Sequence, residues 1–191
     1  DYTRAEEINV AAGVYLETAV RELERNGLDA AQHLAHGPTT VVQEAAQLLA
    51  RLGRGEIEPA LFLAHSGHRA PHDWELAAAR YVEDDDLVAT MADRSAGIAH
   101  REPAVRTPLA RKVLDLAVER ALHWQGLKEE AKHLALRDVA FLRRILLALG
   151  ERTGFDERIF LLRIDEVGRL DDAIWRGGRA LEIVQERTDE R

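Results

Sequence analysis

The segment from residue 109 to residue 150 decides the fold class: LARKVLDLAVERALHWQGLKEEAKHLALRDVAFLRRILLALG. It follows Pro108, the last proline of the chain, so no proline interrupts a helix from here on. Its apolar residues recur at helical spacing in two stripes, one on each side of Gly126: Leu109, Val113, Leu116, Ala117, Ala121 and Trp124, then Leu127, Ala131, Leu134, Phe141, Ile145 and Leu149. This pattern predicts two long helices, or one helix with a kink.

Helical patterns also cover much of the sequence outside this segment. Apolar residues at helical spacing from Ile8 to Leu23 predict a helix over 4–25, which Asn26-Gly27 ends. Further helices are expected from an N-cap at Thr39 or Thr40 to Gly53, after Pro59, over 83–94 and over 171–186, with a loop over 66–73.

One segment lacks the helical pattern. Residues 159–164, IFLLRI, form a short apolar run enriched in β-branched and aromatic residues, which is typical of extended structure. The predicted fold class is therefore all-α: an irregular helical bundle with two long C-terminal helices and at most one short extended segment near 159–164. The 191 residues are enough to bury a core, and we expect one helical domain.

The composition excludes several classes of protein. Hydrophobic residues make up 46% of the chain and no apolar run approaches the roughly 20 residues that cross a bilayer, so we expect a soluble, cytoplasmic protein. The net charge of −8 argues against nonspecific binding to nucleic acid or to an anionic membrane. The absence of cysteine excludes disulfides, thiolate zinc sites and cysteine nucleophiles.

Three short patterns suggest metal or nucleotide chemistry, and each has a simpler structural interpretation. Three histidines are spaced like zinc ligands, but Gly67 and Pro71 prevent one helical face from presenting them: His65, His68 and His72. Glu130-x-x-His133 has a spacing that di-iron bundles use twice, and it occurs once. Residues 53–55, GRG, lack the Lys-Ser/Thr of a phosphate loop. We therefore predict no metal site in this segment.

The lysines are more informative, because the chain has only three: Lys112, Lys128 and Lys132. Lys128 and Lys132 are four residues apart, so they share a helix face. Two cations at this spacing repel unless an anion or a carboxylate lies between them. A solvated face of mixed charge, with Glu129 and Glu130 beside the lysines, is the structural alternative to an anion site.

Several longer pieces follow a family pattern in the same order and spacing. Residues 62–84, FLAHSGHRAPHDWELAAARYVED, are similar to Phe-Leu, Tyr-Gly-His-Arg-Gly, an acidic and an aromatic residue, Glu-Leu, and Pro-Arg-Trp-x-Glu-Asp, with Ser66, Ala70, Ala79 and Tyr81 in place of Tyr, Gly, Pro and Trp. Residues 127–132, 142–150 and 158–167 follow Arg-Glu-x-x-Lys, Leu-Arg-x-x-Leu-Leu-x-Leu-Gly and Asp-Ile-Phe-Tyr-Leu-Thr-x-Asp-Glu-Leu. Together they resemble the later part of the central helical domain of phosphoenolpyruvate synthase-like dikinases, including rifampin phosphotransferases.

The resemblance implies a place in a larger enzyme. Such enzymes combine an ATP-binding domain, a swivelling domain whose histidine carries the phosphoryl group, and a helical domain that receives the substrate. The expected partners are a small-molecule acceptor and the ATP-binding and phosphohistidine domains of the same parent chain. ATP and Mg would belong to the parent, and no cofactor is expected in this segment. The first residues, DYTRAEE, read as a cut end, and we expect the segment alone to be inactive.

The resemblance also assigns roles to individual residues. The Arg and Lys of the Arg-Glu-x-x-Lys motif map to Lys128 and Lys132 as catalytic cations that stabilise the transferring phosphoryl group. Lys in place of Arg at 128 loses the planar, bidentate guanidinium. The other residues assigned to substrate binding are Glu129, His68, Arg69, Glu75 and Arg80. For the last four, ion pairs and hydrogen bonds that hold the loop in shape are the structural alternative.

Two expectations concern the loop and the acceptor. The loop from Gly67 to Arg80 is expected to be ordered and anchored by charge, with Trp74 and Leu76 pinning the same side of it. Aromatic residues make up only 5% of the chain, so an acceptor pocket would be built mainly from Leu, Val, Ile and Ala, which favours a small or aliphatic acceptor. A free-standing helical interaction module that kept the fold and lost the chemistry is the alternative function.

Overall fold

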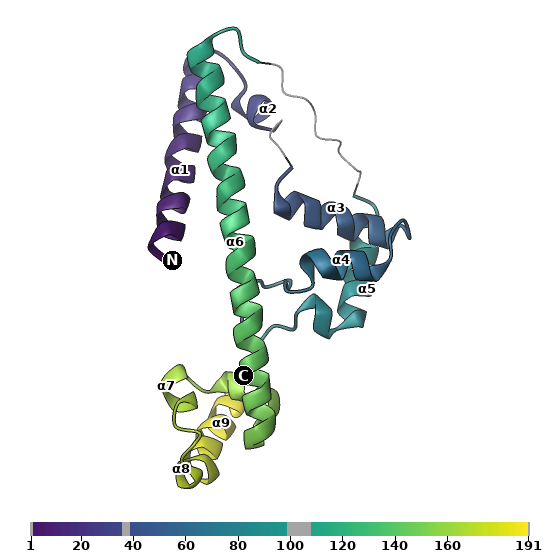
Figure 1. Cartoon of the computed structure of the whole chain (residues 1–191), viewed down its shortest axis with the longest axis vertical. Coiled ribbons are helices and arrows are strands. Elements are labelled where there is room, and N and C mark those ends of the chain that lie inside the picture. The colour runs from purple at the N-terminus through teal and green to yellow at the C-terminus, as the bar shows by residue number, and fades with distance from the viewer. Residues whose placement is uncertain (1, 36–38, 99–107, 191) are drawn as a thin grey trace. The chain divides into compact units, whose positions relative to one another are not determined.

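The computed structural model describes residues 2–35, 39–98 and 108–190 (Figure 1). Within these ranges every regular element is a helix and none is a strand, which confirms the all-α class. The elements are α1 Tyr2–Arg25, α2 Ala30–Leu34, α3 Val41–Gly53, α4 Pro59–Ser66, η1 Tyr81–Glu83, α5 Asp85–Ser95, α6 Lys112–Thr153, η2 Asp156–Leu161, α7 Ile164–Val167, α8 Ala173–Gly177 and α9 Arg179–Asp189, where η marks a 3₁₀-helix.

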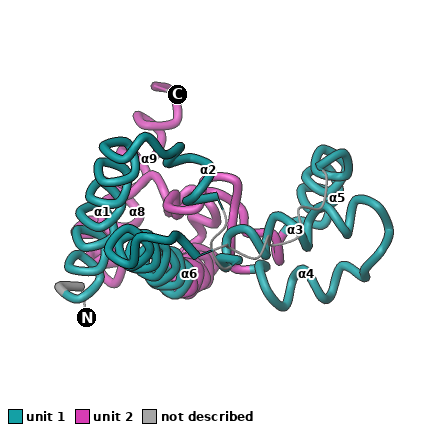
Figure 2. The backbone as a smooth tube through the Cα atoms, turned by 90° about the horizontal axis from the view of Figure 1, so that it is seen from above, with its two compact units in different colours: residues 1–67, 84–135 teal, residues 68–83, 136–191 magenta. Residues whose placement is uncertain are grey.

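The chain divides into two compact units (Figure 2). Unit 1 consists of residues 1–67 and 84–135, and unit 2 consists of residues 68–83 and 136–191. The long helix α6 contributes residues to both units, so the division does not fall at a linker. The expectation of one domain cut from a larger enzyme stays a prediction, and each unit is described by itself below.

The two predicted apolar stripes of residues 109–150 lie on one continuous helix, α6, which is 42 residues long. After residue 108, α6 and α9 are the two longest helices. Several residues of the predicted stripes are exposed, among them Val113, Leu116, Leu134, Phe141 and Ile145. Ala121 of the first stripe is buried, and the other buried apolar residues of α6 lie outside both stripes: Leu114, Val118, Leu136 and Ala140. The helical period was correct, but apolar residues occur on more than one side of α6, so the pattern alone did not identify its buried face.

In unit 1, helix α1 packs along the first half of α6 (Figure 1). The rings of Tyr15 and Trp124 stack with their centroids 5.7 Å apart, and the amide of Gln125 donates a hydrogen bond of 3.2 Å to the carbonyl oxygen of Ala12. Helix α1 ends at Arg25, followed by Gly27 in the left-handed region with φ 69°, as the Asn-Gly pair predicts.

Helix α3 begins at one of the two predicted N-caps and ends at Gly53, as predicted, whereas the short helix α2 was not predicted. Thr40 caps α3: its hydroxyl accepts from the backbone N–H of Gln43, whose side chain accepts from the N–H of Thr40. At the end of α3, a Cβ on Gly53 would lie 2.0 Å from the carbonyl oxygen of Ala92, so glycine allows α3 and α5 to pack closely. The helix predicted over 83–94 is present as α5, with Asp84 as its N-cap, and the preceding η1 belongs to unit 2.

Unit 2 is organised around a core of large apolar side chains and one small one: Phe155, Ile159, Leu170, Trp175, Ala180 and Val184. The expectation that residues 159–164 are extended was wrong for most of the segment, because Ile159 to Leu161 belong to η2. A lone strand needs a neighbour for its backbone groups, whereas η2 satisfies them locally, as in the 3.0 Å bond from the N–H of Leu162 to the carbonyl oxygen of Ile159. Only Leu162 and Arg163 keep extended backbone angles.

The helix predicted over 171–186 is divided into α8 and α9. Gly178, with φ −117° and ψ −95°, separates them, since no helix includes these angles. Asp172 caps α8 by accepting hydrogen bonds from the N–H groups of Ile174 and Trp175. The paired glycines 177 and 178 are the sequence signal for this break.

Candidate functional site

The residues assigned from the sequence fall into the two units. Lys128, Glu129 and Lys132 belong to α6 in unit 1, whereas His68, Arg69, Glu75 and Arg80 belong to the segment 68–83 of unit 2. We describe the two groups separately, as the lysine face of α6 (Lys128, Glu129 and Lys132) and the arginine-anchored loop (residues 68–83).

The lysine face lies on the side of α6 that unit 1 buries. Lys128 follows the buried Ala121 by seven residues, and Lys132 follows Gln125, which bonds to α1, by seven. Both lysine side chains are half-buried, whereas Lys112 is exposed. The pair therefore belongs to the inward side of the helix and not to its fully solvated face. A cleft in front of the lysines stays a prediction.

A group of polar side chains lies next to the lysine face in unit 1. The rings of His65, on α4, and His133, on α6, have centroids 5.5 Å apart, and His133 is buried. The Nδ1 atom of His65 lies 2.7 Å from the hydroxyl of Ser66, and its Nε2 atom lies 3.4 Å from a carboxylate oxygen of Glu44, on α3. His133 follows Glu129 by one helical turn. Polar contacts thus connect α3, α4 and α6 beside the lysine face.

The arginine-anchored loop is held by two ion pairs and by backbone hydrogen bonds. Arg69 pairs with Asp73, with its Nη2 atom 2.6 Å from the carboxylate, and the side chains are 11% and 13% exposed. The backbone N–H of Tyr81 donates to the carbonyl oxygen of Arg69 at 2.9 Å, which closes the loop. Burial raises the pKa of the Tyr81 phenol, with the carboxylate of Asp73 adding to the shift.

Arg80 is fully buried and bonds to the backbone of its own loop. Its two terminal nitrogens donate to the carbonyl oxygens of Asp73 at 2.8 Å and Glu75 at 2.9 Å. Burial lowers the pKa of its guanidinium, and the neighbouring cation of Arg143 lowers it further. With no exposed surface, Arg80 cannot contact a substrate in this conformation, so its observed role is to hold the loop.

Sequence reasoning missed Arg143, the residue that connects the loop to α6. Its side chain is 2% exposed, and it donates to the carboxylate of Glu83 at 2.8 Å and to the carbonyl oxygen of Leu76 at 2.8 Å. Its guanidinium also lies 4.9 Å from the ring centroid of Phe160. The available signal was its position seven residues after the buried Leu136, on the inward side of α6.

The loop is anchored by charge, as expected, but not by every residue named for it. The anchoring carboxylates are those of Asp73 and Glu83. Glu75 is exposed and contributes its backbone carbonyl. Trp74 is 59% exposed and does not pin the loop, whereas Leu76 is half-buried. Residues 71–74 and 76–77 form turns, so the alternation assumed for an extended segment does not apply.

The histidines with zinc-like spacing are divided between the units: His65 belongs to unit 1, and His68 and His72 to unit 2. Across the described ranges, no group of three His, Asp or Glu side chains is arranged to hold a metal ion. No helix in the described part of the chain has both the length and the apolar character needed to cross a membrane.

Comparison of the chain with protein-family models, with curated proteins and with solved structures finds no match.

Proposed function

We propose that this chain is the acceptor-binding helical domain of a phosphoenolpyruvate synthase-like or rifampin phosphotransferase-like enzyme. The parent would transfer a phosphoryl group from ATP, through a phosphohistidine, to a small-molecule acceptor in the cytoplasm. ATP and Mg would be bound by the parent's other domains, and the segment alone would not transfer phosphate. Neither nucleic acid nor a membrane is a proposed partner.

The position of Lys128 and Lys132 is the observation that carries this proposal. A long aliphatic cation on the inward side of a helix loses hydration, and two of them one turn apart repel each other. Such an arrangement is favourable where a multiply charged anion is bound, and a phosphoryl group in transfer spreads negative charge over its equatorial oxygens. The resemblance assigns these two positions to the same task.

Within this proposal, the residues of the arginine-anchored loop have mainly a positioning role. Arg69 and Arg80 hold the loop through Asp73 and through backbone carbonyls, so they shape whatever surface the loop presents. Glu75 remains the exposed candidate for contact with an acceptor, and we retain His68 as a second candidate. Glu129 would lie beside the two cations and help to orient them.

The proposal is tested in the parent enzyme with the three lysines of the chain. Lys128→Ala and Lys132→Ala should each lower the rate of acceptor phosphorylation by tenfold or more, while phosphorylation of the swivelling histidine by ATP stays unchanged. Lys112→Ala is the matched control, because Lys112 lies on the same helix and is exposed. Lys128→Arg should raise acceptor turnover, since it restores a bidentate guanidinium. Equal rates for all four variants would contradict the proposal.

A free-standing helical interaction module is the second candidate. Lys in place of Arg at position 128 favours it, and so do three exposed apolar side chains on α6 in unit 2: Phe141, Leu142 and Ile145 are 55%, 50% and 47% exposed. The flanking coding sequence separates the two candidates. An ATP-binding domain upstream and a Gly-rich histidine motif downstream would support the enzyme, and their absence would support the module.

A further inference from the structure

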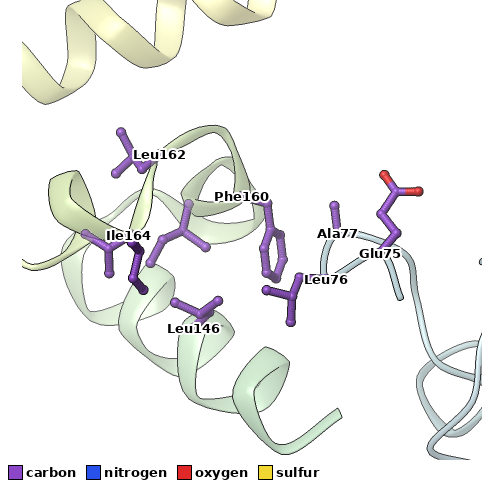
Figure 3. Close-up of a pocket in the computed structure, with 9 residues that line it drawn as sticks. Glu75, Leu76, Ala77, Leu146, Phe160, Leu162 and Ile164 are labelled. Atoms are coloured by element: carbon purple, nitrogen blue, oxygen red, sulfur yellow. The ribbon is translucent and has the colours of Figure 1, made fainter. Parts of the chain in front are cut away.

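A pocket of about 280 Å³ opens within unit 2 (Figure 3). Its lining comes from residues 75–77 of the arginine-anchored loop, from Leu146 of α6 and from residues between Ile159 and Val167. Every lining residue other than Glu75 is apolar. Lys128 and Lys132 are not among the lining residues, so the pocket is a feature separate from the lysine face.

Arg143 holds two walls of the pocket in place. Its guanidinium donates to the carbonyl oxygen of Leu76 on one wall and lies 4.9 Å from the ring centroid of Phe160 on the other. Leu76 and Phe160 face each other in Figure 3. Arg80 fixes the first wall again, through the carbonyl oxygen of Glu75. Collapse of the pocket would break hydrogen bonds of buried cations, which is costly, so the pocket is built before a ligand arrives.

A second ion pair holds the opposite rim. The carboxylate of Glu166 accepts from the backbone N–H of Arg163 at 2.7 Å and from both terminal nitrogens of Arg187 at 2.7 and 2.9 Å. This pair fixes α7, which contributes Ile164 and Val167 to the lining. The rim is therefore tied to α9 and does not depend on contacts across the pocket.

The lining defines the chemistry of the ligand. A volume of this size lies near the lower limit of small-molecule sites, about 300 Å³, and an apolar wall selects a hydrocarbon body. Glu75 is the one ionisable residue among those that line the pocket, and its carboxylate points away from the apolar side chains in Figure 3. The nearby cation of Arg143 is engaged by Glu83, Leu76 and Glu157, so it does not favour an anionic head.

We propose that this pocket binds a small aliphatic amine, with its hydrocarbon chain between Leu76, Leu146 and Phe160 and its ammonium group beside Glu75. The site needs no phosphoryl group and no residue of unit 1, and its test measures binding alone, so it can fail or succeed separately from the proposed function even though Glu75 is named in both. Burial of the ligand's hydrocarbon chain supplies most of the affinity, and the exposed carboxylate of Glu75 supplies a modest preference for a cation.

The test is a titration of the whole chain with hexylammonium, followed by amide chemical shifts in NMR. Saturable shifts are expected for residues 75–77, 146 and 159–167. Hexanol should bind several-fold more weakly and hexanoate more weakly still, at matched ionic strength. Glu75→Gln should remove the preference for the amine over the alcohol while leaving saturable binding of both.

Two variants fill the pocket from different walls. Leu146→Trp and Ala77→Leu should each weaken hexylammonium binding tenfold or more, and the second keeps α6 intact in case the first does not fold. Leu142→Trp is the control, because Leu142 is an exposed leucine of the same helix outside the pocket. Unsaturable shifts, equal binding of hexanoate and hexylammonium, or unchanged binding in folded Ala77→Leu would each overturn the proposal.

Discussion

Arg143 is buried on the inward side of α6, and its surroundings explain how a charge is tolerated there. One nitrogen pairs with the carboxylate of Glu83, another bonds to the backbone of Leu76, and the plane of the guanidinium packs against Phe160. The guanidinium of Arg80, its neighbour, donates to two backbone carbonyl oxygens, those of Asp73 and Glu75. The two arginines therefore hold residues 68–83, a segment with little regular structure, in one position within unit 2.

We predict that Arg143→Ala lowers the free energy of unfolding by about 3–5 kcal/mol, because it leaves Glu83 and a buried carbonyl without their donor. Arg144→Ala is the matched control. Arg144 is exposed and contacts Phe141 on the surface, so its loss should cost less than about 1 kcal/mol. Urea denaturation of both variants measures the difference. Similar denaturation midpoints would show that the ion pair between Arg143 and Glu83 does not stabilise the fold.

A second prediction separates the loop residues that support the structure from those that do not. Arg69→Ala should lower the melting temperature clearly, at a cost of about 1–3 kcal/mol, because its ion pair with Asp73 is almost buried. Glu75→Ala should change stability as little as Lys128→Ala, since the structure uses the backbone of Glu75 and not its carboxylate. Thermal melts of the three variants are sufficient. A large loss for Glu75→Ala would show that its carboxylate supports the fold.

At the scale of elements, the two glycines of α6 illustrate two different uses of the same residue. Gly126 has open space where a Cβ would be, whereas a Cβ on Gly150 would lie 2.3 Å from the carbonyl oxygen of Asp156. Gly150 also accepts a 2.9 Å hydrogen bond from the N–H of Phe155, in the turn through which Gly154, with φ 78°, ends the helix. The close approach at Gly150 is what allows η2 to pack on the end of α6.

Gly126→Ala should therefore stabilise the protein by about 0.5–1 kcal/mol, through the higher helix propensity of alanine. Gly150→Ala should destabilise it by about 1–3 kcal/mol, because the added methyl group forces η2 away. The two substitutions are chemically identical and lie on one helix, so each serves as the other's control in chemical denaturation. The same sign for both would contradict the packing described here.

The pair between α7 and α9 makes stability depend on pH. Hydrogen bonds from Arg187 lower the pKa of Glu166 below its ordinary value near 4.5. A carboxylate with a lowered folded pKa stabilises the protein above the unfolded pKa and loses this contribution as the pH falls through the folded pKa. Glu166→Gln should thus reduce stability at pH 7, and the difference from the wild type should shrink below about pH 4.

Denaturation at a series of pH values measures this difference directly. Glu182→Gln is the control, because Glu182 pairs with Arg179 in an exposed position, where an ion pair contributes little. A difference between wild type and Glu166→Gln that stays constant from pH 7 to pH 3 would exclude the linkage.

Element by element, the features that the sequence predicted well are those set by local chemistry. Three helix ends were predicted from a few neighbouring residues, and the structure has them: the N-cap at Thr39 or Thr40, which is Thr40, the end at Asn26-Gly27, and the start after Glu58 at Pro59. The segment 159–164 was misassigned because its β-branched and aromatic residues serve the core of unit 2 from a 3₁₀-helix. The apolar composition of this segment indicates that it is buried, but it does not determine the backbone conformation. Within the described ranges no strand lies beside the segment to pair with it, so its backbone groups bond locally in a 3₁₀-helix.

At the scale of the whole molecule, the candidate site shows the same contrast between features set by neighbouring residues and features set by distant contacts. The spacing of Lys128 and Lys132 predicted a shared face, but which side of α6 is buried depends on contacts with α1 that no local pattern encodes. Arg143 was not identified because its partners, Glu83 and Leu76, are more than 50 residues away in sequence. The division into two units was not predicted either, since residues 68–83 join unit 2 across a large separation in the chain.

The division into two units predicts that each unit unfolds locally by itself. Unit 1 has its own contacts between α1 and α6, including the stacked Tyr15 and Trp124, and unit 2 has its own core around Phe155 and Trp175. Regions with separate cores open as separate cooperative units, even where one helix belongs to both. Arg143→Ala removes contacts of unit 2 alone, so it should speed hydrogen exchange in residues 68–83 and 136–190 and leave the amides of 112–135 nearly unchanged. Hydrogen-exchange mass spectrometry resolves these peptides. Equal acceleration along the whole of α6 would mean that the two units unfold as one.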